Sequence, residues 1–86
     1  EVSYAPDARF LRTREGLLSA VSERLAQLSP DVRAGVEASL ATVQRARANI
    51  EDALGRDPGN ALLQEMLVNS YQDEMRVLTT VREIGT

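Results

Sequence analysis

The carboxylates are the side chains in this sequence best suited to acid–base chemistry, but the usual catalytic partners are missing. The chain has no His and no Cys, so a nucleophile–base pair of the Ser–His or Cys–His kind cannot form. Two adjacent acidic pairs could still supply an acid and a base, Glu51-Asp52 and Asp73-Glu74. Neighbouring residues on a helix project about 100° apart, so neither pair converges on one substrate. The sequence therefore predicts a protein that is not an enzyme.

Metal, cofactor and nucleic-acid sites are equally poorly provided for. Helical di-metal sites use Glu-x-x-His repeats, which this chain lacks because it has no His. The turn Asp57-Pro58-Gly59-Asn60 has too few carboxylates for a calcium loop. No Gly-rich phosphate loop is present. All ten basic residues are Arg, scattered among thirteen acids, and the net charge is −3. A nucleic-acid binder would cluster its basic residues on one face. We therefore expect no metal, no cofactor and no nucleic acid.

Three charged residues interrupt otherwise apolar helix faces and form a candidate polar notch: Arg14, Arg47 and Glu74. Two arginines cannot be buried together without partners. Either their stems pack while the guanidinium groups reach solvent, or they pair with acids such as Glu51 or Asp52. The functional alternative is a notch that binds a partner protein.

Proline signals divide the chain into helices. Ser29-Pro30-Asp31 combines a good N-cap, a proline suited to the first helical position and an acid in the first turn. Pro6-Asp7 and Asp57-Pro58 indicate similar starts, Gly55 fits a left-handed stop, and Gly85 ends the last helix. We expect a tail over residues 1–6, then a single domain over 7–86 with helices over about 7–28, 30–55 and 58–84.

The fold class follows from apolar spacing and short turns. Apolar residues recur three and four positions apart in each segment, as in Leu18, Val21 and Leu25. The connections are short, so consecutive helices should pack antiparallel to each other. In the register that follows from these turns, Leu40 should lie beside Glu74. The expected fold is all-α: three long helices in an antiparallel, up-down-up, coiled-coil-like bundle. A long hairpin with a docked first helix is the alternative packing.

The third helical segment carries a broad apolar stripe that could face a partner. The candidate residues for a partner or dimer face are Leu63, Met66, Leu67, Tyr71, Met75 and Leu78. Met and Tyr adapt well to partner surfaces. The simpler interpretation is that the other two helices cover this stripe as core. A shared version, part core and part homodimer face, would help so small a bundle.

Residues 28–84, about two thirds of the chain, resemble a known family. An LSP turn leads into EASLATVQRA, and a DPGNA turn leads into LLQEMLVNSYQDEMRVL. This pattern is similar to the C-terminal helical domain of bacterial zinc-finger-type, membrane-anchored anti-sigma factors. The resemblance implies a parent with a cytoplasmic zinc-binding segment, a membrane helix and this domain on the extracytoplasmic, periplasmic side. It implies a sensory or regulatory role through protein contacts, with no functional residue to carry over.

Two further hypotheses remain open at the level of sequence. DPGNALLQEMLVNSY also looks like the opening of a tetratricopeptide helix, so a cytoplasmic helical adaptor is the alternative function. A small-molecule sensor would show an apolar pocket lined by Met66, Tyr71 and Met75. The chain starts at Glu1 and not at Met, which suggests a piece of a longer protein. In the anti-sigma interpretation, Tyr4, Phe10 and Leu11 would lie at the junction with the membrane helix.

Overall fold

The computed structural model describes residues 6–84, and every regular element in this range is an α-helix. The helices are α1 (Ala8–Leu25), α2 (Pro30–Arg56) and α3 (Ala61–Glu83). The predicted all-α class with three packed helices is confirmed. Three predictions fall outside the described residues: the tail before Pro6, the junction residue Tyr4 and the stop at Gly85.

The first two helices begin where their cap residues place them. Asp7 is the N-cap of α1 and accepts a hydrogen bond from the Phe10 amide at 2.8 Å, so it lies just before the helix and not in its first turn. Ser29 caps α2 by accepting from the Val32 amide at 3.4 Å, with Pro30 directly after it. Helix α1 ends at Leu25, earlier than predicted, because tight i to i+3 bonds close the chain at Gln27 and Leu28.

The second turn lies further along the chain than the sequence suggested. Gly55 was expected to end α2 in a left-handed conformation, but it is helical and the helix continues to Arg56. Asp57 was expected to open α3, yet the cap is Asn60, whose side chain accepts from the Leu63 amide at 3.1 Å. The residues between form a β-turn closed by the Asn60 amide on the Asp57 carbonyl at 3.1 Å. Pro58 takes the second position of this turn, where its fixed φ fits.

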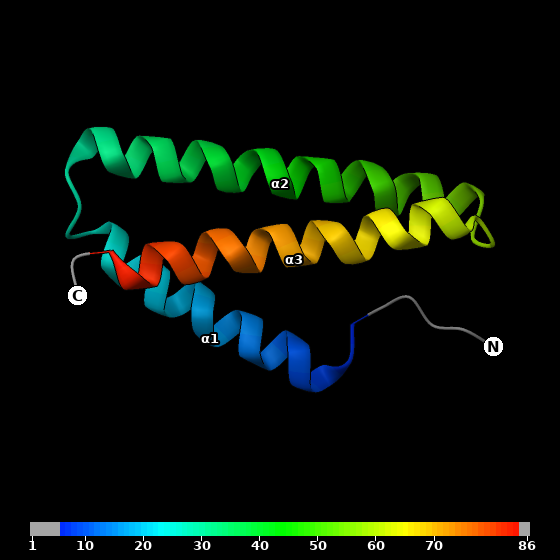
Figure 1. The fold of residues 1–86 in the computed structure, drawn as a ribbon, viewed down its shortest axis with the longest axis horizontal. Coiled ribbons are helices and arrows are strands. Elements are labelled where there is room, and N and C mark those ends of the chain that lie inside the picture. Colours follow the sequence, from blue (N-terminus) through cyan, green and yellow to red (C-terminus); the bar gives the residue numbers. More distant parts are fainter. Residues whose placement is uncertain (1–5, 85–86) are drawn as a thin grey trace.

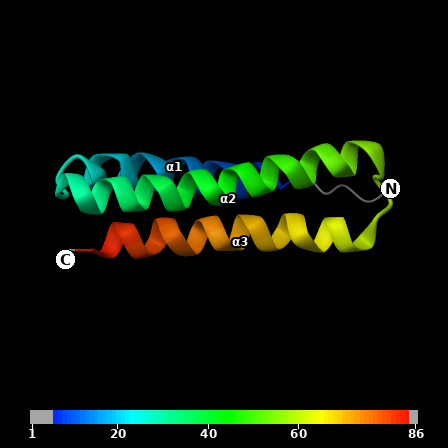
Figure 2. The same ribbon diagram turned by 90° about the horizontal axis from the view of Figure 1, so that it is seen from above.

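Helix α3 is the central element and packs against both other helices, whereas α1 and α2 contact each other sparsely (Figure 1). The sequence colours run in opposite directions along α2 and α3, and in the same direction along α1 and α3. Seen from above, α1 and α2 lie on the same side of α3 (Figure 2). The described part of the chain is flat, with extents of 44 × 25 × 14 Å.

The apolar core lies where the C-terminal halves of α1 and α3 meet the start of α2. Its buried members are Leu17, Val21, Leu78 and Val81. Leu18, Leu25, Val36, Leu40, Met75 and Val77 pack around them. Nearly all are aliphatic, as a composition of 3% aromatic residues requires. At the other end of α1, polar and aromatic side chains replace this core, and they build the candidate site.

Candidate interaction site

The three predicted notch residues meet at one point, with Glu74 completely buried at its centre. Arg14 of α1 donates two hydrogen bonds to the Glu74 carboxylate, one from Nη2 to Oε2 at 2.9 Å. Arg47 of α2 donates from Nη1 to Oε1 at 2.9 Å, and Gln44 of α2 donates to Oε2 at 3.1 Å. We call these four residues the Glu74 cluster. It is the place where side chains from all three helices bond to one another.

Electrostatics favour the ionised form of the central carboxylate. Burial by itself raises the pKa of Glu74, but the hydrogen bonds from Arg14, Arg47 and Gln44 outweigh it and lower the pKa to about 2. The same contact raises the pKa of Arg14, because its hydrogen bond to Glu74 outweighs its partial burial. Glu74 is therefore a charged group at any physiological pH, held between two guanidinium groups.

The cluster corrects the sequence interpretation of these residues. The arginines were expected to reach solvent or to pair with Glu51 or Asp52, but their carboxylate partner is Glu74, and Asp52 pairs with Arg56 at 2.7 Å. Leu40 was expected beside Glu74, a position held by Gln44. This shift of one helical turn has the same origin as the misplaced cap: α2 runs on to Arg56, so the hairpin reverses later. Opposite charges interrupting facing apolar seams were the signal for this pairing.

Tyr71 connects the Glu74 cluster to the surface. The guanidinium carbon of Arg47 lies 4.5 Å from the centre of the Tyr71 ring, a cation–π contact. The Phe10 ring meets Tyr71 edge-to-face, with centroids 5.5 Å apart and planes at 85°. The two aromatic rings of α1 and α3 are thus oriented by a buried ion cluster behind them.

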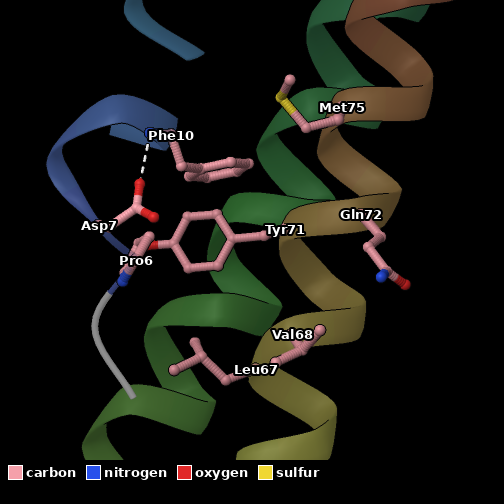
Figure 3. Close-up of a pocket in the computed structure, with 8 residues that line it drawn as sticks. All are labelled: Pro6, Asp7, Phe10, Leu67, Val68, Tyr71, Gln72 and Met75. Carbon is pink, nitrogen blue, oxygen red and sulfur yellow. Dashed lines mark hydrogen bonds between the residues drawn. The ribbon is translucent and has the colours of Figure 1, made fainter. Parts of the chain in front are cut away.

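An apolar groove opens beside these rings, between the start of α1 and the middle of α3 (Figure 3). Its volume is about 460 Å³. Its lining residues, here called the aromatic groove, are Pro6, Asp7, Phe10, Leu67, Val68, Tyr71, Gln72 and Met75. Figure 3 shows the Tyr71 ring extending from α3 toward Pro6 and Asp7, with Phe10 above it. Val68 is 53% exposed, so apolar surface at this site is open to solvent.

The predicted stripe on α3 does not lie on one surface. Leu67 and Leu78 are buried within the chain, whereas Leu63, Tyr71 and Met75 are half-buried. Met66 is 41% exposed and is not among the residues of the aromatic groove. Three stripe residues, Leu67, Tyr71 and Met75, do line that groove. The pocket predicted for a small-molecule sensor, with Met66, Tyr71 and Met75 in its lining, is therefore present only in part, because Met66 does not line the groove.

Sequence reasoning missed the contribution of α1 to this site. Phe10 and Asp7 come from the start of α1, and they join the groove because Arg14, one turn further along, is fixed on Glu74. Val68 and Gln72 were missed because they lie outside the apolar stripe. A rare aromatic residue one turn before an unexplained arginine was the available signal.

Two other features are absent from residues 6–84. No group of three or more acidic side chains is arranged to hold a metal ion in this range. None of the three described helices has the run of apolar residues that crossing a bilayer requires.

No family model, no curated protein and no solved structure matches the chain. The geometry of the site and the resemblance of residues 28–84 are therefore the two indications of function.

Proposed function

We propose that this chain is a non-catalytic regulatory domain that works through protein–protein contacts, in a membrane protein of the anti-sigma-factor type. The observation that carries the proposal is the aromatic groove, in which Phe10 of α1 and Tyr71 and Met75 of α3 present a recessed apolar surface. Aromatic residues and Met are enriched at protein interfaces. The resemblance of residues 28–84 supports the class of parent protein and an extracytoplasmic position.

The occupant we propose for the groove is an apolar segment of a partner protein, such as one face of an amphipathic helix. The groove is open and not enclosed, which suits a segment lying along α3. Tyr71 and Phe10 provide anchor surfaces for apolar side chains. Gln72, which is exposed at the edge, can donate and accept hydrogen bonds with a polar flank.

Such binding would act on the position of α1. The groove lies between the N-terminal end of α1 and α3, so an occupant adds contacts to both helices. Helix α1 contacts α2 only sparsely, so its start is held mainly by α3. A partner that binds one arrangement of α1 better than another shifts the population toward it. In the parent we propose, the segment preceding α1 would carry this change toward the membrane.

A transcript measurement with matched variants in the parent gene tests this function. Val68→Glu places a charge in the groove, and Ala41→Glu places the same charge on the exposed face of α2. Both positions are exposed, so each change should cost under about 0.5 kcal/mol of stability. We expect Val68→Glu alone to change expression of a sigma-factor-dependent set of genes. Equal transcript profiles for Val68→Glu, Ala41→Glu and the unaltered chain would contradict the proposal.

A small apolar ligand is the second candidate for the groove. Its volume of about 460 Å³ lies within the roughly 300–1,000 Å³ typical of ligand pockets. Under this candidate, indole as a probe should raise the melting temperature of the unaltered chain and not that of Val68→Glu. The tetratricopeptide alternative gains no such support, since α2 and α3 have 27 and 23 residues, too long for a pair within a repeat of about 34.

A further inference from the structure

A second apolar groove lies between α2 and α3, and its inner wall of Val36, Val77 and Val81 belongs to the core that α1 also packs against. Its lining residues are Val32, Gly35, Val36, Ser39, Arg76, Val77, Thr80, Val81 and Ile84. Its volume is about 390 Å³. Gly35 faces open space at the α2 side of this groove, where an added Cβ would meet nothing within 4 Å. This face is separate from the aromatic groove, because the two share no lining residue.

Helix α3 extends this face toward its other end as a stripe that is exposed except at the half-buried Val77. The positions are three or four residues apart and so share one side of the helix. We call them the outer stripe: Leu62, Met66, Asn69, Asp73, Val77, Thr80 and Ile84. At the N-terminal end of α3, Leu62 is 65% exposed and Met66 is 41% exposed, which makes an apolar projection. The outer stripe therefore carries a projection at one end and a groove at the other.

The outer stripe is symmetric about its middle residue. Leu62 and Ile84 lie equally far along the helix from Asp73, and so do Met66 and Thr80. A two-fold axis at Asp73 would therefore place Leu62 and Met66 of one copy on the groove of the other, twice over. An interface of this kind must contact itself in that reciprocal way. The projection and the groove on one straight helix meet this requirement.

Charge at the centre also matches a second copy. Asp73 pairs with Arg76 at 3.0 Å, and both side chains are largely exposed. A two-fold axis at Asp73 brings the two carboxylates close together, and the Arg76 guanidinium groups of the two copies offset this repulsion by flanking both carboxylates. Opposite charges in alternation favour register and orientation at an interface. A partner of a single charge sign would find one of these two groups repulsive.

The available area is that of a small stable interface. Helix α3 has 23 residues and is about 34 Å long at 1.5 Å per residue. Two packed helices are about 20 Å wide, so the α2–α3 face offers roughly 700 Å² of projected surface. A standard interface buries about 800 Å² per partner.

We propose that the outer α2–α3 face binds a second copy of this chain, with the two α3 helices antiparallel about an axis at Asp73. This homodimer face shares only Met66 with the stripe predicted from the sequence; the stripe's other members, Leu63, Leu67, Tyr71, Met75 and Leu78, lie outside it. It leaves the aromatic groove open in both copies. The inference goes beyond the proposed function and does not require it.

Solution mass with charge reversal tests the inference. As the concentration is raised to about 1 mM, we expect the unaltered chain to form a dimer that sediments at twice its 9.4 kDa. Asp73→Arg leaves two positive groups near the axis in each copy, and Arg76→Asp leaves two negative groups. Each variant alone should be monomeric at low salt, and an equimolar mixture should recover the double mass. A monomeric unaltered chain, or a mixture that stays monomeric, would overturn the inference.

Variants at the two ends of the stripe locate the interface. Gly35→Leu fills the groove from an exposed position, and Met66→Glu charges the projection. Both should lower the dimer fraction at least tenfold at a fixed concentration, with helicity by circular dichroism unchanged. Val68→Glu, in the aromatic groove, is the matched control and should remain dimeric. If Val68→Glu dissociated the dimer and Gly35→Leu left it intact, the interface would lie at the aromatic groove, and the proposed α2–α3 interface would be refuted. Loss of the transcript response with the dimer intact would count only against the proposed function.

Discussion

At the scale of residues, one buried carboxylate organises this protein. Glu74 has no exposed surface, and its oxygens accept hydrogen bonds from Arg14, Arg47 and Gln44. A buried ion pair contributes little net stability when it is compared with a well-packed apolar core. Its effect on specificity is larger, because any other register of α1 or α2 on α3 would leave a charge buried without a partner. The Glu74 cluster thereby fixes the alignment of three helices whose aliphatic faces are otherwise interchangeable.

Substituting Glu74 should therefore be far more damaging than substituting Asp52, an acid in an exposed ion pair. Glu74→Gln removes the charge and leaves two guanidinium groups facing each other, which should cost about 3–5 kcal/mol of unfolding free energy. Asp52→Asn is the matched control, since its ion pair with Arg56 is exposed and its loss should cost less than about 1 kcal/mol. Urea unfolding followed by circular dichroism measures both. Similar costs for the two variants would show that Glu74 has no special role.

Stability should fall in acid over a window set by Glu74. The pKa of this carboxyl is about 2 in the folded chain, below its value of about 4.3 when unfolded. A lowered folded-state pKa means that the stabilisation is fully present above the unfolded pKa and is lost as the pH falls toward the folded one. Between about pH 5 and pH 2 the chain should lose about 3 kcal/mol from this group. In Glu74→Gln that part of the acid dependence should be absent when urea midpoints are compared across the window.

Sequence reasoning found these residues but not their pairing. Arg14, Arg47 and Glu74 were recognisable because each interrupts an apolar seam. Which acid meets which arginine depends on helix register, and a shift of one turn exchanges Leu40 for Gln44 beside Glu74. Phe10 and Val68 could not be assigned to the aromatic groove for the same reason, since that site forms only once α1 is aligned on α3.

At the scale of elements, local cap chemistry accounts for both the correct and the incorrect boundaries. Ser29 and Pro30 start α2 as the sequence predicts, with the serine hydroxyl accepting from the Val32 amide. In the second turn two side chains could cap α3, and Asn60 does so while Asp57 accepts a bond from Asn60 Nδ2 at 3.0 Å. The sequence contains both candidates, and their order does not decide between them.

Gly55 provides a direct test of where α2 ends. In the structure it is helical and a Cβ there would meet nothing within 4 Å, so Gly55→Ala should stabilise the chain by about 0.5–1 kcal/mol. Gly16→Ala, at an equally open helical position in α1, should give a similar gain. Thermal unfolding of the two variants is the measurement. A destabilised Gly55→Ala would indicate the left-handed stop that the sequence pattern first suggested.

At the scale of the whole molecule, α3 holds the fold together, and this could be anticipated only in part. Its buried residues outnumber those of either other helix, and α1 and α2 both dock on it with little contact between them. The rich apolar content of α3 indicated a covered helix. The flat arrangement, with two separate open grooves, depends on side-chain detail such as Gly35 and Phe10 and was not predictable from periodicity.

Removal of α1 should therefore unfold the remaining hairpin. Deleting residues through Leu28 would uncover Leu78 and Val81 and remove Arg14 from Glu74. A chain of this size has a thin margin of stability, so residues 29–86 should lose their cooperative thermal transition. Circular dichroism against temperature measures this. A hairpin that melts cooperatively at the temperature of the full chain would contradict the central position given to α3.

The titration of Glu74 itself is the most direct test of the account. If three helices meet at this carboxylate, its side-chain carbon, followed by NMR through the acid range in the intact chain, should titrate at about pH 2. The carbon should also be perturbed in Arg14→Gln and in Arg47→Gln, since both arginines bond to it. A midpoint close to the ordinary glutamate value of about 4.3 would mean that the cluster does not form, and that the groove it supports is not built as described.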